Sequence, residues 1–109
     1  MEQEFAGKVA LVTGAAGHGI GQGVARRLAQ GGATVIVTDW HERRTKEVSE
    51  AIAKDYGATV AGYTLDVTDR TRVAEVLGDV KEKYGPVQMS DLTATGRTVA
   101  QQVASQIVK

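Results

Sequence analysis

Hydrophobic and polar positions change their spacing several times along the chain, and each spacing predicts one kind of element. Short apolar and β-branched runs predict three strands, the first buried on both faces, over residues 9–12, 34–38 and 58–65. Apolar residues that recur every three or four positions predict three amphipathic helices, over residues 20–30, 41–56 and 70–84. Strand and helix therefore alternate three times, which predicts a parallel sheet with helices on its faces.

The alternation breaks after Pro86, which is the only proline in the chain. A fourth strand is due at this point, and only Val87-Gln88-Met89 is available to form it. From residue 90 onward a sparse apolar stripe predicts a terminal helix. We therefore predict a single domain over residues 1–109, in which residues 86–109 form an irregular join and that helix.

Composition narrows the classes of function. Lysine plus arginine and aspartate plus glutamate each number 13, so no net charge favours nucleic acid or an anionic membrane as a partner. The absence of cysteine excludes disulfides, thiolate metal sites and thiol catalysis, and it is typical of a reducing compartment. The start, MEQEF, is unlike a secretory signal, and no apolar run reaches the length of a membrane span. We therefore expect a cytoplasmic protein.

The stretch KVALVTGAAGHGIG, residues 8–21, predicts an anion-binding turn between the first strand and the first helix. Free backbone amides and the positive end of the helix dipole point toward such a turn, and glycine lets a phosphate approach the backbone closely. The alternatives are a plain tight turn and, for the histidine, an exposed loop position. The candidate contacts are Gly14, Gly17, His18, Gly19, Ile20 and Gly21.

Asp39 ends the second predicted strand, where a carboxylate can accept hydrogen bonds from both hydroxyls of an adenosine ribose and repels a 2′-phosphate. Its alternative role is the N-cap of the helix that starts near His41. Trp40 either lies against the adenine or faces solvent. Arg43 and Arg44 either receive a 2′-phosphate or belong to a solvated helix face. We predict NAD as the cofactor and keep NADP as the alternative.

Thr13-Gly14 and Gly19-Ile20-Gly21, preceded by a strand, resemble the glycine motif T-G-x-x-x-G-I-G of the short-chain dehydrogenase/reductase family. Four residues separate Gly14 from Gly19 in this chain, where the family pattern has three. The general G-x-G-x-x-G fingerprint fits in no register. The longer turn therefore resembles the family's phosphate-binding loop without matching it residue for residue.

The resemblance covers residues 5–85 and implies the cofactor-binding half of an NAD(P)-dependent oxidoreductase that acts on a ketone/alcohol pair. The implied fold is a Rossmann-like, doubly wound α/β parallel sheet, truncated to about three strands in the order 3-2-1. The resemblance also places Asp66 and Val67 beside the adenine. A capping turn for the helix that begins after Asp69 explains these two residues equally well.

The family's catalytic serine and its Tyr-x-x-x-Lys pair have no match in this chain. A residue other than lysine stands four positions after each tyrosine, in the pairs Tyr56 and Val60, Tyr63 and Val67, and Tyr84 and Gln88. Asp91 stands where the family has a catalytic asparagine, and aspartate lacks the amide donor. We therefore name no catalytic residue and predict cofactor binding without turnover by this chain alone. His41 has no second ligand at metal spacing, so no metal site is predicted.

Two other functions stay open. The segment Gly17-His18-Gly19-Ile20-Gly21 followed by Asp39 also fits an S-adenosylmethionine-dependent methyltransferase. The absence of the family's serine, tyrosine and lysine fits a non-catalytic nucleotide-binding or interaction module.

Without a fourth strand, the strand at residues 9–12 would be an uncharged apolar edge of the sheet. We therefore predict a homo-oligomer. The predicted ligand is a dinucleotide, and a small carbonyl or alcohol substrate is expected only for a fuller chain.

Overall fold

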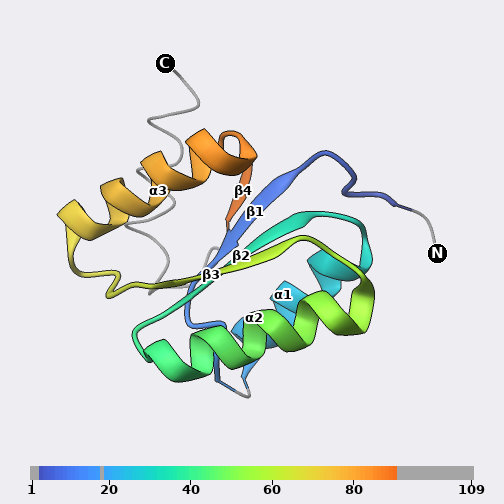
Figure 1. The fold of residues 1–109 in the computed structure, drawn as a ribbon, viewed down its shortest axis with the longest axis horizontal. Helices are drawn as coiled ribbons and strands as arrows, with labels where there is room; N and C mark the ends of the chain where they lie inside the picture. Colours follow the sequence, from blue (N-terminus) through green and yellow to red (C-terminus); the bar gives the residue numbers. More distant parts are fainter. Residues whose placement is uncertain (1–2, 18, 91–109) are drawn as a thin grey trace.

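The computed structural model describes residues 3–17 and 19–90, which form a parallel sheet between two layers of helices (Figure 1). The strands are β1 (Val9–Val12), β2 (Thr34–Asp39), β3 (Val60–Thr64) and β4 (Met89–Ser90), in the spatial order β3-β2-β1-β4. The helices are α1 (Ile20–Gln30), α2 (Glu42–Tyr56) and α3 (Arg70–Tyr84). In Figure 1, α1 and α2 cover one face of the sheet and α3 covers the other. The predicted α/β class, the parallel sheet and the 3-2-1 order are confirmed.

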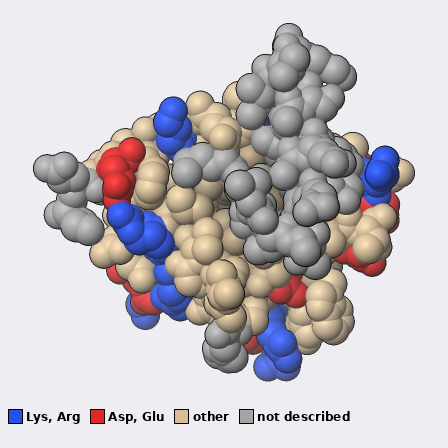
Figure 2. Space-filling model, turned by 180° about the vertical axis from the view of Figure 1, so that it is seen from behind, with Lys and Arg blue, Asp and Glu red and all other residues tan. Residues whose placement is uncertain are grey.

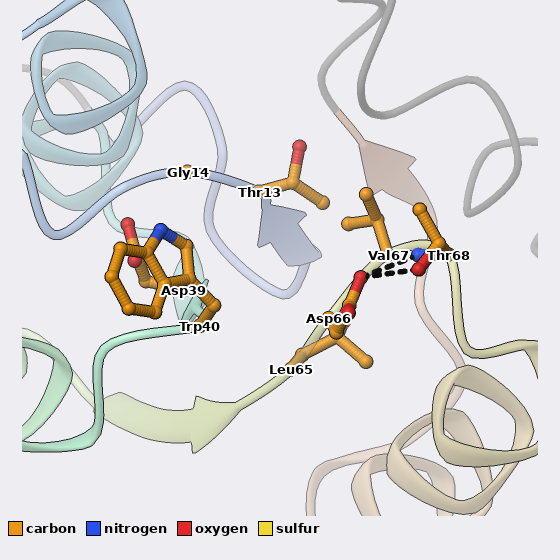
Figure 3. A pocket seen from close by; sticks show the side chains of 8 residues that line it. All are labelled: Thr13, Gly14, Asp39, Trp40, Leu65, Asp66, Val67 and Thr68. Atoms are coloured by element: carbon orange, nitrogen blue, oxygen red, sulfur yellow. Dashed lines mark hydrogen bonds between the residues drawn. The ribbon is translucent and has the colours of Figure 1, made fainter.

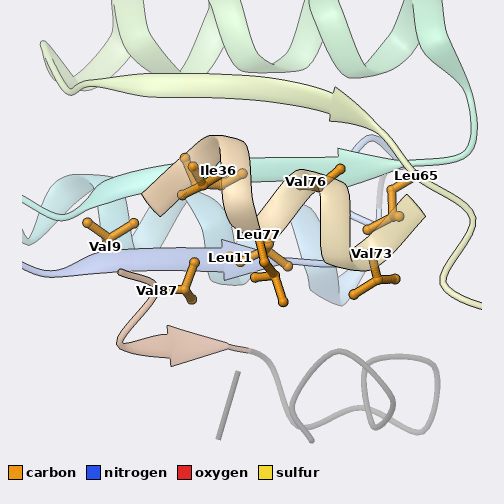
Figure 4. Close-up of a cluster of buried hydrophobic side chains, with 9 residues drawn as sticks. Val9, Leu11, Ile36, Leu65, Val73, Val76, Leu77 and Val87 are labelled. Atoms are coloured by element: carbon orange, nitrogen blue, oxygen red, sulfur yellow. The ribbon is translucent and has the colours of Figure 1, made fainter. Parts of the chain in front are cut away.

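Alternate residues of the two central strands face opposite helix layers, which divides the interior into two cores. On the α3 side, Leu11 of β1 and Ile36 of β2 pack against the apolar stripe of α3 (Figure 4). This core consists of Val9, Leu11, Ile36, Leu65, Val73, Val76, Leu77, Val80 and Val87. The core beneath α1 and α2 consists of Val12, Ala15, Ala25, Ala29, Ala33, Val35, Val37 and Ile52. Burial on both faces explains why β1 and β2 are continuous apolar runs in the sequence.

Capping residues set both ends of α2 and α3. His41 Nδ1 accepts a hydrogen bond at 3.2 Å, and Asp69 Oδ1 accepts one at 3.0 Å, each from the backbone N–H three residues later. Gly57 and Gly85 end the two helices with φ values of +61° and +104°, which glycine adopts without steric cost. The predicted ends of these helices agree with the structure to within one residue.

β4 corrects the expectation that β1 is an unpaired edge. Residues 89–90 pair in parallel with residues 10–11, and the backbone N–H of Gln88 donates to the carbonyl oxygen of Val9 at 2.9 Å. The Gln88 side chain also accepts a hydrogen bond from the Val9 N–H at 3.3 Å. Two residues carry no periodicity, so the pattern could not predict a strand whose pairing comes from the backbone of β1. β1 is therefore not the unpaired edge through which self-association was predicted.

The described surface carries charges of both signs. On the face shown in Figure 2, the visible basic and acidic side chains lie around the periphery and are interspersed. No helix among the described residues is long and apolar enough to cross a membrane. The expectations about His18, Asp91 and a terminal helix fall on residues that lie outside the described part of the chain.

Candidate functional site

A cavity of about 380 Å³ lies at the carboxyl ends of β1, β2 and β3 (Figure 3). Its lining residues are Thr13, Gly14, Asp39, Trp40, Leu65, Asp66, Val67 and Thr68. In Figure 3, Asp39 and Trp40 stand on one side, and the segment after β3 stands on the other. β1 lies between β2 and β4, so the cavity is beside the point where the strand order reverses. Open α/β sheets bind their ligands in this position.

Glycine is required at two positions of the turn between β1 and α1. Gly14 has a φ of +60°, which an L side chain rarely adopts. A Cβ atom at Gly21 would lie 2.6 Å from the carbonyl oxygen of Gly14, so α1 could not start as close to the end of β1. At Gly17 and Gly19 a Cβ atom would meet nothing within 4 Å, so these two glycines leave open space along the turn.

The first turn of α1 is suited to an anion. Gly19 is its N-cap, and among the described residues no side chain caps this helix end and no acidic residue lies in its first turn. The first amides of a helix have no partner within the helix, and the helix dipole adds positive charge there. Ile20, the first residue of the helix, is 80% exposed, and its apolar side chain offers these amides no hydrogen-bond acceptor.

Asp39 connects the end of β2 to the glycine turn. Its Oδ2 accepts a hydrogen bond from the backbone N–H of Ala16 at 3.1 Å, and its Oδ1 accepts one from the N–H of His41, also at 3.1 Å. A backbone hydrogen bond from Ala15 to the carbonyl oxygen of Thr38, at 3.1 Å, holds the turn to β2 beside it. The alternative role of Asp39 as the helix N-cap is wrong, because His41 occupies that position.

Trp40 stands at the rim of the cavity beside Asp39 (Figure 3). Its side chain is 74% exposed, and its ring meets the His41 ring edge to face, with 5.6 Å between the ring centroids. Trp40 therefore faces solvent and also lines the cavity, and its contact with an adenine stays a prediction. A flat apolar surface at this position is available to a planar ligand group.

Asp66 and Val67 form the opposite wall. Asp66 Oδ1 accepts hydrogen bonds from the backbone N–H and the hydroxyl of Thr68, at 2.9 and 2.6 Å. The hydrogen bond from the Thr68 side chain, followed by that from its backbone, lowers the pKa of the Asp66 carboxyl below its ordinary value. The capping turn is confirmed, since Asp69 caps α3, and the same turn presents Asp66 and Val67 to the cavity.

Sequence reasoning identified five of the cavity-lining residues and missed three. Gly14, Asp39, Trp40, Asp66 and Val67 line the cavity, whereas Gly17, Gly19, Ile20 and Gly21 belong to the adjoining turn and helix start. The missed residues are Thr13, Leu65 and Thr68. Each of them is next in sequence to a residue that was predicted, at the end of a strand. That neighbouring position is the sequence signal that could have identified them. Among the described residues no cluster of histidine, aspartate and glutamate could hold a metal ion.

Known proteins resemble this chain in sequence. A model of the short chain dehydrogenase family matches residues 8–106. The 3-oxoacyl-[acyl-carrier-protein] reductase of Salmonella typhimurium is 39% identical over 85 residues, which are 78% of this chain and 33% of that protein. Meso-2,3-butanediol dehydrogenase of Serratia marcescens is 34% identical over 85 residues, which are 78% of this chain and 32% of that protein. The chain thus spans about a third of the length of these curated relatives.

Solved structures agree with this result. A short chain dehydrogenase from Mycobacterium smegmatis superposes with a TM-score of 0.82 at 31% identity, covering 96% of this chain and 54% of that one. L-sorbose reductase from Gluconobacter frateurii, complexed with NADPH and L-sorbose, gives a TM-score of 0.75 at 27% identity, over 83% of this chain and 34% of that one. The methyltransferase alternative gains no support from these matches. The sequence motif, the fold and the matched family together show that this chain belongs to the short-chain dehydrogenase family.

Proposed function

We propose that this chain binds the adenosine and diphosphate portions of NAD, as the dinucleotide-binding part of an oxidoreductase that acts on a ketone/alcohol pair. The observation that carries the proposal is the position of Asp39. Its carboxylate lies at the carboxyl end of β2, lines the cavity and contacts the glycine turn through the Ala16 N–H. A carboxylate in this position can accept hydrogen bonds from ribose hydroxyls, as in other dinucleotide-binding sheets.

The diphosphate would lie against the first turn of α1, where Gly19 caps the helix and backbone amides are available. The adenine would enter the cavity between Trp40 and Val67. That cavity of about 380 Å³ suits an adenosine-sized group rather than a whole dinucleotide. The complex of L-sorbose reductase with NADPH and L-sorbose supports a dinucleotide as the ligand of a chain with this fold.

We propose NAD rather than NADP because of the charge at Asp39. A 2′-phosphate would enter beside this carboxylate and be repelled by it. Of the two nearby arginines, Arg43 is paired with Glu47 at 3.0 Å on the exposed side of α2. Arg44 is exposed and is the remaining candidate to receive a 2′-phosphate, which keeps NADP as the alternative.

A bound NAD supplies hydride chemistry, and the protein supplies position and proton transfer. In this chain no tyrosine is followed four residues later by lysine, so the family's proton-transfer pair is not among residues 1–109. We therefore propose that this chain alone binds the cofactor without reducing a carbonyl. A non-catalytic nucleotide-binding module is the second candidate function, and the same missing pair supports it.

Calorimetric titration of the chain with NAD, NADP and S-adenosylmethionine tests the binding proposal. We expect NAD to bind more tightly than NADP, and S-adenosylmethionine not to bind. Specific binding of S-adenosylmethionine alone, or of none of the three, would overturn the proposal. Steady consumption of NADH with a panel of ketones would contradict the absence of turnover.

Location and assembly stay proposals. The lack of cysteine in the sequence supports a cytoplasmic location. A homo-oligomer stays a prediction, although the pairing of β4 with β1 has removed its original physical reason. Sedimentation at increasing concentration tests it: a constant monomer mass would contradict a homo-oligomer, and a rising mass would support one.

A further inference from the structure

Gln22, in the first turn of α1, connects the glycine turn to the layer of helices. Its Nε2 donates a hydrogen bond to the carbonyl oxygen of Gly17 at 2.7 Å, and its Oε1 accepts one from Nε of Arg26 at 3.0 Å. Arg26 Nη1 then donates to Oδ2 of Asp55, near the end of α2, at 2.8 Å. The three hydrogen bonds form a continuous connection from the turn, along α1, to α2.

Donor and acceptor chemistry leaves the Gln22 amide one orientation. The carbonyl oxygen of Gly17 can only accept, and the guanidinium of Arg26 can only donate. The NH₂ group of Gln22 must therefore face Gly17 and its oxygen must face Arg26. Gln22 and Arg26 are both half-buried against α1, so their side chains lie along the helix surface rather than in open solvent.

The contact matters because Gly17 has no side chain that could fix the conformation of the turn. Four residues separate Gly14 from Gly19, one more than in the family motif T-G-x-x-x-G-I-G. Gly17 has no side chain to pack, and even an added Cβ atom there would meet nothing within 4 Å. Glycine has a larger choice of backbone conformations than other residues, so a hydrogen bond to its carbonyl group restricts it strongly.

We propose that Gln22 is a positioning residue for the diphosphate of the ligand, an inference that rests on the proposed NAD site. A turn that binds an anion must present backbone N–H groups to it and keep carbonyl oxygens away, because these carry partial negative charge. Gln22 holds the Gly17 carbonyl oxygen against α1. It thereby compensates for the additional residue of the turn, and Arg26 and Asp55 hold Gln22 in place.

The test compares two ligands across matched variants of the full chain. Gln22→Met keeps the length of the side chain and removes both hydrogen bonds, whereas Gln22→Glu keeps the acceptor for Arg26 and removes the donor to Gly17. Gln30→Met makes the same substitution at an exposed position in the last turn of α1 and is the control. Dissociation constants for NAD and for adenosine, which has no phosphate, are measured by NMR titration.

We expect Gln22→Met to raise the dissociation constant for NAD about three- to tenfold and to leave that for adenosine unchanged. Gln22→Glu should weaken the binding of NAD at least as much, and Gln30→Met should change neither dissociation constant. An unchanged NAD constant in both Gln22 variants, or an equal loss for both ligands, would overturn the inference. If Gln22→Met fails to fold, Gln22→Leu replaces it in the same comparison, because Gln22→Glu also places a negative charge beside the diphosphate. If the unmodified chain binds neither ligand, the proposed function itself fails.

Discussion

The carboxylate of Asp39 accepts a hydrogen bond from the backbone N–H of Ala16, 23 residues earlier in the chain. Its other oxygen accepts one from the N–H of His41 at the start of α2. A carboxylate offers about four acceptor positions, so two remain for further donors. One side chain thus joins the glycine turn to the end of β2 and keeps room for the ribose hydroxyls of the site that we propose.

Replacing Asp39 with asparagine should therefore change both cofactor preference and stability. Asparagine is uncharged and offers one acceptor oxygen, so either Ala16 or His41 loses its partner. We expect the dissociation constant for NAD to rise about tenfold and the preference for NAD over NADP to become smaller. The free energy of unfolding should fall by about 1 kcal/mol. Calorimetry with both cofactors and urea unfolding measure these effects. Glu50→Gln, which removes a charge from an exposed position of α2, is the control, and an unchanged ratio of the two affinities would refute the role of the charge at Asp39.

The two glycines at the start of α1 make a matched pair for the steric argument. In Gly21→Ala the new Cβ atom would lie 2.6 Å from the carbonyl oxygen of Gly14, and backbone must move to relieve the contact. We expect a loss of about 1–3 kcal/mol in the free energy of unfolding. In Gly23→Ala the new atom meets nothing within 4 Å, so the better helix propensity of alanine should add about 0.5–1 kcal/mol. Equal effects in urea unfolding would show that helix propensity, rather than close approach, decides both.

The candidate site was predictable where an apolar strand ends in a charged residue. Asp39 follows a continuous β-branched run, and the end of such a run in a parallel sheet faces the binding crevice. The cap of α2 was not predictable in the same way. Histidine is an uncommon N-cap, so Asp39 was the better candidate from residue type alone. Only the observed hydrogen bond of His41 Nδ1 separates the two roles.

Some features of the fold depend on contacts that no local pattern encodes. Gly62 interrupts the apolar run of β3, and a Cβ atom there would lie 2.9 Å from the Ser49 hydroxyl oxygen and 3.1 Å from the carbonyl oxygen of Thr45. The glycine lets α2 approach the sheet, which a sequence window cannot show. β4 has only two residues, and its pairing is determined by the edge of β1. Strongly periodic segments were predictable because their pattern is repeated many times, as in α3.

A pair that bridges β3 and α3 predicts a change in acid stability. The hydroxyl of Tyr63 donates to Oδ2 of Asp79, which also contacts Lys83 Nζ at 3.2 Å. The hydrogen bond from Tyr63 and then that from Lys83 lower the pKa of the Asp79 carboxyl. Burial, and then the contact with Asp79, raise the pKa of Tyr63 above its ordinary value of 10.0.

The direction of the pH effect follows from these shifts. The lowered pKa of Asp79 contributes stability that is present above its unfolded pKa, about 4, and is lost as the pH falls through the lower folded value. Tyr63→Phe should lower the midpoint of urea unfolding at neutral pH and make the loss of stability below about pH 4 less steep. Tyr84→Phe, at an exposed position of α3, is the control. Parallel acid profiles for Tyr63→Phe and the unmodified chain would contradict this role of the pair.

Trp40 is the only tryptophan in the chain and lines the cavity with its side chain 74% exposed, so its fluorescence reports directly on the proposed adenine position. A ligand that covers the indole removes water from it, and the emission should shift to shorter wavelength. NAD and adenosine should both produce this shift, whereas nicotinamide mononucleotide should not, because only the first two carry adenine. Trp40→Ala should lower the affinity for NAD about fivefold, since stacking of a base on an aromatic ring contributes about 1 kcal/mol at an exposed site. An equal shift with nicotinamide mononucleotide would place the adenine elsewhere.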